Sequence, residues 1–465
     1  MSVLKHKKKV RNHYENTATI SPFGLSYRVV LAKYINHFIP NSNSLLEVGC
    51  GEGHLLALLR SKSKTGLDIC SKALKKARRQ HSSIRFFTGS AESPPKHIGK
   101  FDDIILAEIL NEAYDVQQIL VGLHQFARPQ TRLLISLFSA LWRPFFFLME
   151  LIGWKQKTPE LNWLSRGDIK NLLHLSGWDV VRIESKILMP VNIPWVTEII
   201  NRWVAPLLPF LCLNCFVIAR AQKSRPSSRV SVIVPARNEA GNIRDVCQRI
   251  PKMGSHTEII FVEGHSRDMT WEAIQSAKHE FQNKKIIAIT QSGTGKGNAV
   301  REGFAIASGE ILMILDADLT TPPEDLPKFY SAIVSGRAEF ANGVRLIYPM
   351  EKKAMRFLNL AANHFFSKSF SWILGQPIKD TLCGTKVLWK NDWEKIRQNR
   401  KYFGEFDPFG DFDLLFGADY LNLRIKDIPI RYRERTYGST NIQRWKHGVL
   451  LMQMLAFAAK KVKFI

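Results

Sequence analysis

Short apolar runs alternate with longer segments of helical periodicity along most of this chain. Runs with the character of buried strands stand at 44–48 (SLLEV), 101–107 (FDDIILA), 230–236 (VSVIVPA) and 311–315 (ILMIL), and helix-like segments follow them. Strands that alternate with helices in this way are typical of a mainly parallel sheet that helices cover. The pattern therefore predicts an α/β fold.

The alternation is interrupted once, by the segment ARAQKSRPSSR at 219–229. Charge, Ser and Pro are concentrated there between two strand-like runs, which is typical of a linker. The chain has 465 residues, of which 45% are hydrophobic, so it is long enough for two or three cores. The sequence predicts two α/β domains, residues 1–222 and 230–465, joined by a linker at 223–229.

The run at 311–315 leads directly into two aspartates spaced one apart, in the sequence ILMILDAD. Alternate side chains of an extended chain point to the same side, so Asp316 and Asp318 present two carboxylates at the edge of a sheet. Mg²⁺ and Mn²⁺ prefer such oxygens and keep open positions for phosphate. This predicts a metal and diphosphate site. The alternative is a helix N-cap near Thr321, because Pro322 follows it.

A glycine-rich turn lies early in the chain, within SLLEVGCGEGHLLALL at 44–59. Its glycines let the backbone turn sharply after a strand, and the helix that follows offers unpaired N–H groups. Asp68 ends the next strand-like run, TGLDIC, where a carboxylate can accept both ribose hydroxyl protons of a bound nucleoside.

These motifs, with GSAES at 89–93 and FDDIILAEILNEAYD at 101–115, resemble the class I S-adenosylmethionine-dependent methyltransferases over about residues 30–220. The resemblance implies a Rossmann-like domain with S-adenosyl-L-methionine as cofactor. Dinucleotide oxidoreductases share the glycine turn and the ribose acid, and are the alternative. The residues implied to bind the cofactor are Glu47, Gly49, Gly51, Gly53, Asp68, Ala91 and Glu92.

The methyl acceptor is not visible in the sequence. Methyl transfer from a sulfonium needs mostly alignment, with a base only for a protonated acceptor. Glu108, Glu112, His54 and His124 are candidates for such a base by position alone. For His124, in an apparently amphipathic helix, a packing role is the expectation.

The second half contains an ordered series of motifs: VSVIVPARNEAGNI (230–243), EIIFVEGHSRDMT (258–270), QSGTGKGNAVREGFAIASG (291–309) and then the aspartate pair. This order resembles the family-two glycosyltransferases of GT-A fold, and most of all polyprenyl-phosphate sugar transferases such as the dolichol-phosphate mannosyltransferases. The resemblance implies that Asp318 holds the metal. The residues that it implies along the nucleotide-sugar donor are Pro235, Arg237, Glu239, Glu263, Lys296 and Asp316.

One departure from that family concerns the donor base. Relatives usually have DDGS where this chain has EGHS at 263–266, so the base, uridine or guanosine, stays open. The segment KDTLCGTKVL (379–388) resembles the part that lines the donor sugar and the acceptor, which implicates Asp380, Gly384 and Lys386.

Two further segments carry candidate chemistry. Within 403–418, Asp411 or Asp413 matches the family's catalytic acid, although Asp411 could equally cap a helix. The arginine-rich segment 430–448 resembles the family's phosphate-binding segment; a solvated basic face is the alternative. The phosphate candidates there are Arg435, Thr440 and Arg444.

Together the resemblances predict a bifunctional enzyme. One activity is metal-dependent, inverting transfer of a sugar from a nucleotide-sugar to a polyprenyl phosphate or lipid-linked glycan. The other is S-adenosylmethionine-dependent methylation of an unknown acceptor. One alternative keeps the glycosyltransferase and makes the first domain a non-catalytic module.

A net charge of +25 favours anionic partners, either nucleic acid or an acidic membrane surface. A nucleic-acid-modifying methyltransferase with an accessory sugar-nucleotide domain is thus a further alternative. No base-stacking motif or zinc finger is present, so no nucleic-acid partner is expected. Six scattered cysteines do not form a disulfide framework and favour a reducing cytoplasm. The basic stretch KHKKKVR at 5–11 is interpreted as a flexible arm.

Two segments of the second half suggest a membrane surface. Apolar residues recur every three or four positions in 351–374, with lysines and arginines beside them, as in an amphipathic helix. The apolar run 448–459 is also bracketed by basic residues and, as a helix of about 18 Å, is too short to cross a membrane core of about 30 Å. The hypothesis is a cytoplasmic protein, peripheral at the inner face of the membrane, where both helices meet anionic lipid.

Overall fold

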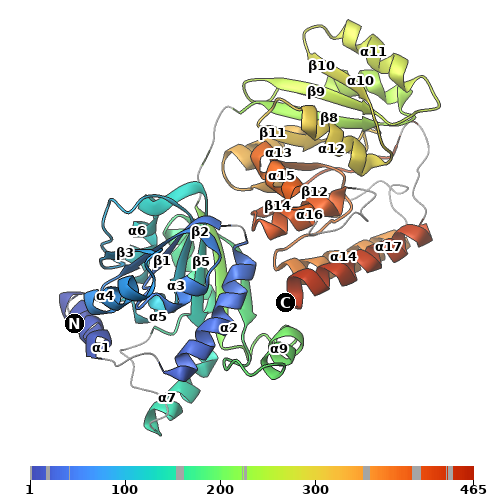
Figure 1. Ribbon diagram of the computed structural model, residues 1–465. Helices are drawn as coiled ribbons and strands as arrows, with labels where there is room; N and C mark the ends of the chain where they lie inside the picture. The colour runs from blue at the N-terminus through green and yellow to red at the C-terminus, as the bar shows by residue number, and fades with distance from the viewer. Residues whose placement is uncertain are drawn as a thin grey trace. The chain divides into compact units, whose positions relative to one another are not determined.

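The computed structural model describes residues 3–16, 21–40, 42–152, 162–221, 224, 228–348, 357–400, 410–435, 437 and 444–465. The chain forms two compact units (Figure 1). Unit 1 comprises Met1–Gln222 with Phe464–Ile465, and unit 2 comprises Lys223–Lys463. In the described part of the chain each unit has one seven-stranded sheet between helices, which confirms the predicted α/β class.

The sheet of unit 1 has the strand order β3-β2-β1-β4-β5-β7-β6. The strands from β3 to β5 pair in parallel, and β7 runs antiparallel between β5 and β6. This is the doubly wound, Rossmann-like arrangement expected from the glycine motif. The strands are β1 (Ser42–Val48), β2 (Ser61–Asp68), β3 (Arg85–Thr88), β4 (Phe101–Ala107), β5 (Ala127–Phe138), β6 (Trp178–Lys186) and β7 (Asn214–Ala221).

Helices cover both faces of this sheet, because successive strand residues point to opposite sides. Leu46 and Ile104 belong to one buried cluster, whereas Leu45 and Ile105 belong to the other. The helices are α1 (Val3–Asn16), α2 (Pro22–Phe38), α3 (His54–Leu58), α4 (Ser71–Gln80), α5 (Ile109–Glu112), α6 (Val116–Gly122), α7 (Arg143–Leu151), α8 (Arg166–Leu175) and α9 (Val196–Ile199).

The basic N-terminal segment is not a flexible arm, contrary to the interpretation from sequence. Residues Val3–Asn16 form α1, and the buried ring of His6 places its Nε2 2.9 Å from the carbonyl oxygen of Glu112. Lys72 on α4 also donates to the carbonyl oxygen of Glu15 at 2.9 Å. Helix α1 is therefore held between α4 and α5.

The sheet of unit 2 has the order β10-β9-β8-β11-β13-β12-β14. The first four strands pair in parallel, β13 runs antiparallel to both neighbours, and β12 and β14 are parallel. This is the mixed sheet expected for a GT-A domain. The strands are β8 (Val230–Ala236), β9 (Thr257–Glu263), β10 (Lys285–Thr290), β11 (Ile311–Ile314), β12 (Phe340–Val344), β13 (Lys386–Trp389) and β14 (Ile425–Pro429).

Helices α14 and α17 pack against each other at one end of unit 2 (Figure 1). Phe366 and Phe370 of α14 and Met454 of α17 belong to the core, whereas Phe365 and Trp372 are exposed. No helix in the described ranges is both long and apolar enough to cross a membrane. The helices are α10 (Ile243–Arg249), α11 (Thr270–Glu280), α12 (Lys296–Ile306), α13 (Leu326–Val334), α14 (Phe357–Leu374), α15 (Lys390–Gln398), α16 (Asp411–Tyr420) and α17 (Arg444–Ala458).

Candidate active sites

The glycine turn of unit 1 follows β1 and is tied to the end of β2. Gly49, Gly51 and Gly53 all have positive φ (81°, 53° and 79°), which only glycine adopts without strain. The Asp68 carboxylate accepts hydrogen bonds from the backbone N–H of Gly51 and of Cys70, both at 2.7 Å. A Cβ added at Gly51 would meet no atom within 4 Å, so the turn has open space beside it for a ligand.

Glu47 lies beneath this turn with an unsatisfied carboxylate. Its side chain is 1% exposed, and its Oε2 has no hydrogen-bond partner among the described residues. Burial raises the pKa of Glu47 to about 8. The charge of Arg28 opposes this shift, and the negative charges of Glu108 and Asp68 add to it. A buried acid with one unpaired oxygen favours a ligand that brings a positive charge. The donor set thus fits S-adenosyl-L-methionine, whose sulfonium and ammonium groups are cationic.

Glu47 should make the stability of unit 1 depend on pH. A raised pKa means that the folded state prefers the protonated carboxyl, so the free energy of unfolding is highest below about 4.5 and falls as pH rises through about 8. The slope approaches about 1.4 kcal/mol per pH unit. We expect Glu47→Gln to flatten this decline in urea unfolding without ligand. A variant that keeps the wild-type slope would exclude Glu47 as its source.

The other cofactor candidates lie at the same edge of the sheet. Ala91 and Glu92 follow β3, and Glu92 accepts hydrogen bonds from the Ser90 hydroxyl at 2.6 Å and from the Tyr114 N–H at 3.4 Å. The expected packing role of His124 is confirmed: its ring stacks on Trp178 with centroids 4.5 Å apart. His124 is therefore removed from the candidate bases.

In unit 2 the aspartate pair follows β11 and is held by cationic side chains. Asp316 Oδ1 lies 2.5 Å from the Lys296 ammonium at the start of α12. Asp318 Oδ2 accepts a hydrogen bond from Arg435 at 2.7 Å, and its Oδ1 accepts from the Thr320 hydroxyl at 2.8 Å. The alternative of a helix cap at Thr321 is wrong, because a short 3₁₀ turn (Pro323–Asp325) intervenes before α13 begins at Leu326.

Arg435 joins the aspartate loop to the loop after β8. Its guanidinium lies 2.7 Å from Asp318 and 3.3 Å from Glu239 Oε1. Burial raises the pKa of Glu239 to about 7, and Arg435 opposes that shift. The backbone N–H of Arg433 donates to the Thr320 carbonyl at 3.0 Å, which docks this segment on the loop. Two carboxylates therefore share one internal cation.

Three strained residues mark the same edge of the sheet. Asn238, His265 and Leu319 follow β8, β9 and β11, and each has φ between 56° and 57°. Non-glycine residues in this conformation are uncommon and cluster at functional sites. Strain at all three loops makes them candidates for contact with a ligand.

The metal candidate can be judged from the oxygens that converge here. No group of three or more His, Cys, Asp or Glu side chains in the described residues forms a ready-made cage. Asp318 nevertheless supplies the carboxylate chemistry that Mg²⁺ or Mn²⁺ prefers, and such ions commonly complete their shell with diphosphate oxygens and water. The internal cation Arg435 occupies the space between Asp318 and Glu239. The residues present fit a divalent ion bound together with a nucleotide.

The remaining donor candidates differ in exposure. Arg237 is exposed and Pro235 is half-buried at the end of β8, so both are accessible to a nucleotide. Glu263 is buried and accepts a hydrogen bond from the Ser266 N–H at 2.6 Å. Glu263 therefore shapes the loop after β9.

The segment after α14 reaches the site through its backbone. A Cβ added at Gly384 would lie 2.2 Å from both Asp316 Oδ2 and Lys296 Nζ. The side chains expected to line the acceptor are instead buried: Asp380 is 0% exposed and pairs with Arg345 at 2.7 Å. The ammonium of Lys386 is buried as well and donates to the Cys383 carbonyl at 2.6 Å. Both side chains are therefore held by internal partners, and a role for Asp380 and Lys386 along the donor sugar and acceptor stays a prediction.

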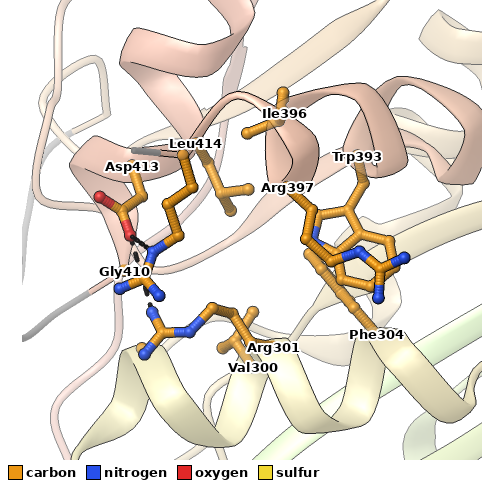
Figure 2. Close-up of a pocket in the computed structure, with 11 residues that line it drawn as sticks. Val300, Arg301, Phe304, Trp393, Ile396, Arg397, Gly410, Asp413 and Leu414 are labelled. Carbon is orange, nitrogen blue, oxygen red and sulfur yellow. Dashed lines mark hydrogen bonds and ion pairs between the residues drawn. The ribbon is translucent and has the colours of Figure 1, made fainter. Parts of the chain in front are cut away.

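The two acids at the start of α16 point to different surroundings. Asp411 is buried, lies 3.6 Å from the Lys386 ammonium and adds negative charge near Lys296. Asp413 faces a small cavity (Figure 2), with Arg400 at 3.1 Å and Arg301 at 3.6 Å. Of these two acids, only Asp411 therefore lies near Lys296, a residue expected to contact the nucleotide-sugar donor.

The last phosphate candidates are beyond what the structure describes. Thr440 lies outside the described residues, and Arg444 is described only as the first residue of α17. One structural contributor was missed from sequence, Arg345, which pairs with the buried Asp380. For Arg345 the available signal was its place directly after β12.

Each unit contains a region that is similar to known proteins. Residues 40–181 match the family model described as "Methyltransferase domain", and residues 231–416 match "Glycosyl transferase family 2". The dolichol-phosphate mannosyltransferase of Pyrococcus furiosus is 37% identical over 227 residues, 46% of this chain and 59% of that protein. That of Saccharomyces cerevisiae is 38% identical over 112 residues, 23% of this chain and 42% of that protein. The chain thus spans about half the length of these relatives.

One further curated relative and two solved structures are also similar to parts of this chain. The undecaprenyl-phosphate 4-deoxy-4-formamido-L-arabinose transferase of Shewanella sediminis is 30% identical over 111 residues, 23% of this chain and 34% of that protein. Two solved structures are a Mycobacterium tuberculosis glucosyl-3-phosphoglycerate synthase with Mn²⁺ and UDP (18% identity, TM-score 0.37, 50% of this chain, 80% of that one) and a Thermotoga maritima SAM-dependent methyltransferase (14%, 0.32, 48% and 96%). Residues 231–416 of this chain thus match the family 2 glycosyltransferase model, and residues 40–181 match a methyltransferase domain model.

Proposed function

We propose that the chain is a bifunctional enzyme. Unit 2 transfers a sugar from a nucleotide-sugar, with Mg²⁺ or Mn²⁺, to a polyprenyl phosphate or a lipid-linked glycan. Unit 1 transfers a methyl group from S-adenosyl-L-methionine to an acceptor. The observation that carries the first activity is the convergence of Asp316, Asp318 and Glu239 with the cations Lys296 and Arg435 at the ends of neighbouring parallel strands.

The geometry supports direct, inverting displacement. A divalent ion held by Asp318 would neutralise charge on the departing diphosphate. Lys296 keeps its positive charge, because Asp316 outweighs the effect of burial and holds the pKa of this ammonium above its ordinary value. Arg435, half-buried beside Asp318, is placed to bind a phosphate once an ion balances the aspartate. Together these groups stabilise the charge that develops as the acceptor oxygen attacks.

The relatives guide the choice of acceptor. Their names include dolichol phosphate and undecaprenyl phosphate, both polyprenyl phosphates. A phosphate acceptor is already anionic and needs no base, whereas a hydroxyl acceptor would require Asp411 to take its proton. The experiment is transfer from radiolabelled UDP- and GDP-sugars to a short polyprenyl phosphate, with and without a chelator. Failure with every donor, in protein that binds nucleotide, would reject this acceptor class.

Asp68→Ala should test the methyl-donor site. Removing a charged acceptor from the ribose hydroxyls costs about 1.5–3 kcal/mol, a loss of roughly 10- to 150-fold in affinity for S-adenosylmethionine. Calorimetry should detect that loss while affinity for the nucleotide-sugar stays constant. Unchanged S-adenosylmethionine affinity would remove Asp68 from the site.

We further propose that unit 2 works as a peripheral protein on the cytoplasmic, anionic face of a membrane. The outer sides of α14 and α17 expose Phe365, Trp372, Val449 and Met452. Three lysines follow α17, in the sequence AKKVKFI. Apolar side chains beside basic ones are typical of helices that lie in the interface plane.

Anionic liposomes should therefore sediment the protein at low salt and release it at high salt, because screening weakens the attraction. Val449→Ser with Met452→Ser should reduce binding about 10-fold, since about 1.4 kcal/mol of apolar contact is lost. Both side chains are exposed, so the fold should survive. Equal binding by this variant would place the membrane contact elsewhere.

A further inference from the structure

A polar cluster that is partly buried, and unassigned by the proposed function, lies beside the glycine turn of unit 1. Glu108 follows β4, and its Oε1 accepts hydrogen bonds from the Tyr27 hydroxyl at 2.9 Å, the Ser136 hydroxyl at 2.8 Å and the Asn214 amide at 3.2 Å. Asn214 also donates to Tyr27 at 2.6 Å and to Ser136 at 3.0 Å. Three donors from α2, β5 and β7 thus hold one carboxylate oxygen.

The other oxygen of Glu108 is left available. All three donors serve Oε1, and within the described ranges no hydrogen bond to Oε2 is found. Glu108 also has φ of 57°, a strained conformation for this residue. Ile109, the next residue, packs so closely on the glycine turn that a Cβ at Gly49 would lie 2.7 Å from it. Glu108 therefore precedes a residue that contacts the proposed methyl-donor site.

An apolar surface adjoins this cluster. It is formed by residues 141–152, which include α7, and 193–211, which include α9, and the Trp142 indole N–H donates to the Leu211 carbonyl at 3.0 Å. Trp195 is 84% exposed and Phe147 63% exposed. Their exposed apolar side chains are Leu141, Phe145, Phe147, Leu148, Leu151, Ile152, Ile193, Trp195, Val196, Ile199, Trp203, Val204, Leu207, Phe210 and Leu211.

Contacts along the chain join the surface to the cluster. The Phe138 ring lies between Tyr27 and Phe146 of α7, with ring centroids 6.4 Å and 5.2 Å away. The Asn192 N–H donates to the Ser26 hydroxyl at 2.6 Å, one residue before Tyr27. Figure 1 shows α7 projecting from the body of unit 1. A molecule with an apolar chain could lie on this surface with its polar end at Glu108.

We propose that Glu108 is the catalytic base of the methyl-acceptor subsite, and that the acceptor is a hydroxyl group on a lipid-like, apolar-tailed molecule. This inference rests on the proposed methyltransferase activity of unit 1. Tyr27, Ser136 and Asn214 are positioning residues, which fix Oε1 and leave Oε2 toward the acceptor. A neutral hydroxyl, unlike a phosphate, has a proton that must be removed on methylation.

The step balances without a further reactant. S-adenosyl-L-methionine, when bound, supplies an activated methyl group on a positively charged sulfur. The acceptor oxygen forms a bond to the methyl carbon as the carbon–sulfur bond breaks, and that electron pair stays on sulfur. The acceptor proton passes to Oε2 of Glu108, so the products are a methyl ether, a neutral thioether and a protonated acid. Exchange with water then returns the carboxylate.

The surroundings of Glu108 suit this role. Burial raises the pKa of Glu108, while the hydrogen bonds from Ser136 and Tyr27 and the charge of Arg28 oppose the shift. Glu47 on β1 adds a second carboxylate facing it. A base whose pKa is raised toward neutrality transfers protons more effectively at neutral pH. The rate of methylation should rise with pH until Glu108 is ionised and then level off.

The test uses full-length protein, methyl-tritiated S-adenosylmethionine and two probes, a lipid extract and an aqueous extract of cells to which the chain is native. Label is expected in the lipid fraction as a base-stable ether.

Glu108→Gln should lower the rate of lipid methylation about 100-fold or more and abolish its pH dependence. Tyr27→Phe should shift the pH profile, which a purely structural role would not do. Glu15→Gln, which alters a carboxylate near Arg11 on α1, is the matched control and should keep the wild-type rate.

A second variant tests the apolar surface without touching the cluster. Phe147→Ser should reduce labelling of the lipid fraction several-fold at unchanged S-adenosylmethionine affinity. Label confined to the aqueous fraction or to amines, or a full rate in Glu108→Gln, would overturn the proposal, as would no label at all in protein that binds S-adenosylmethionine. Loss of S-adenosylmethionine binding by the wild-type protein would instead overturn the proposed function of unit 1.

Discussion

Asp318→Asn is expected to lower sugar transfer by about 1,000-fold or more, equivalent to roughly 4 kcal/mol of transition-state stabilisation. An amide keeps an oxygen for the Thr320 hydroxyl but loses the negative charge that a divalent ion requires. The variant also loses its ion pair with Arg435, which lies 2.7 Å away. The measurement is transfer from a radiolabelled nucleotide-sugar at saturating Mg²⁺ and Mn²⁺.

The matched control is Asp245→Asn on α10, where the carboxylate is exposed and remote in sequence from the aspartate loop. That variant should keep full transfer. Asp318→Asn should retain methyl transfer, because unit 1 contains all the residues proposed for that reaction. Chelator-sensitive transfer at the wild-type rate by Asp318→Asn would show that the ion is held elsewhere.

The fold of both units was predictable because the patterns behind it are local. The apolar run at 311–314 becomes β11, and the glycine-lysine loop opens α12 at Lys296, as its composition predicts. Glycine positions were equally informative: positive φ at Gly49, Gly51 and Gly53 follows from a turn that no other residue adopts without strain. The order of the strands in each sheet was not predicted from these patterns.

The chemistry at each strand end could also be anticipated in part. Asp68 ends β2 as expected, but Asp316 and Asp318 do not alternate along an extended strand, because β11 ends at Ile314 and Asp318 lies in a turn. What the sequence could not reveal is which acids already have partners. Asp380 and Asp318 are both aspartates and cannot be distinguished from sequence alone. In the structure, however, Arg345 pairs with Asp380 in the protein interior. That pairing joins residues 35 positions apart.

Long-range contacts explain the rest of what was missed. The hydroxyl of Tyr27 reaches Glu108 across 81 residues, and the Asn214 amide reaches it across 106. No local period or spacing encodes such a meeting, since it depends on how the sheet brings α2, β4 and β7 together. Residues that are close in sequence can also have different surroundings. Asp413 stands two residues from Asp411, yet it pairs with Arg301 and Arg400, which line a cavity together with it (Figure 2).

Gly384→Ala should inactivate unit 2 without unfolding it. The added methyl group would lie 2.2 Å from Asp316 Oδ2 and 2.2 Å from Lys296 Nζ, which is closer than any real contact allows. The ion pair between these side chains, 2.5 Å apart, must therefore separate or shift. Misplacing groups that contact the nucleotide by about 1 Å can cost roughly 100-fold in rate. We expect sugar transfer and nucleotide affinity both to fall by about that factor.

Gly448→Ala provides the matched control, because a Cβ at Gly448 would meet no atom within 4 Å and the residue lies in helix α17. Alanine there should raise stability by about 0.5–1 kcal/mol, because glycine has the lower helix propensity, and leave transfer unchanged.

The long side chain of Lys296 can reduce the clash at Gly384→Ala, since its flexible end can move away from a new methyl group. Double substitution with Lys296→Met therefore decides the cause: if the methyl group acts by displacing this ammonium, Gly384→Ala adds little to the loss that Lys296→Met already produces. Full additivity of the two losses would mean that Gly384→Ala damages the site by another route.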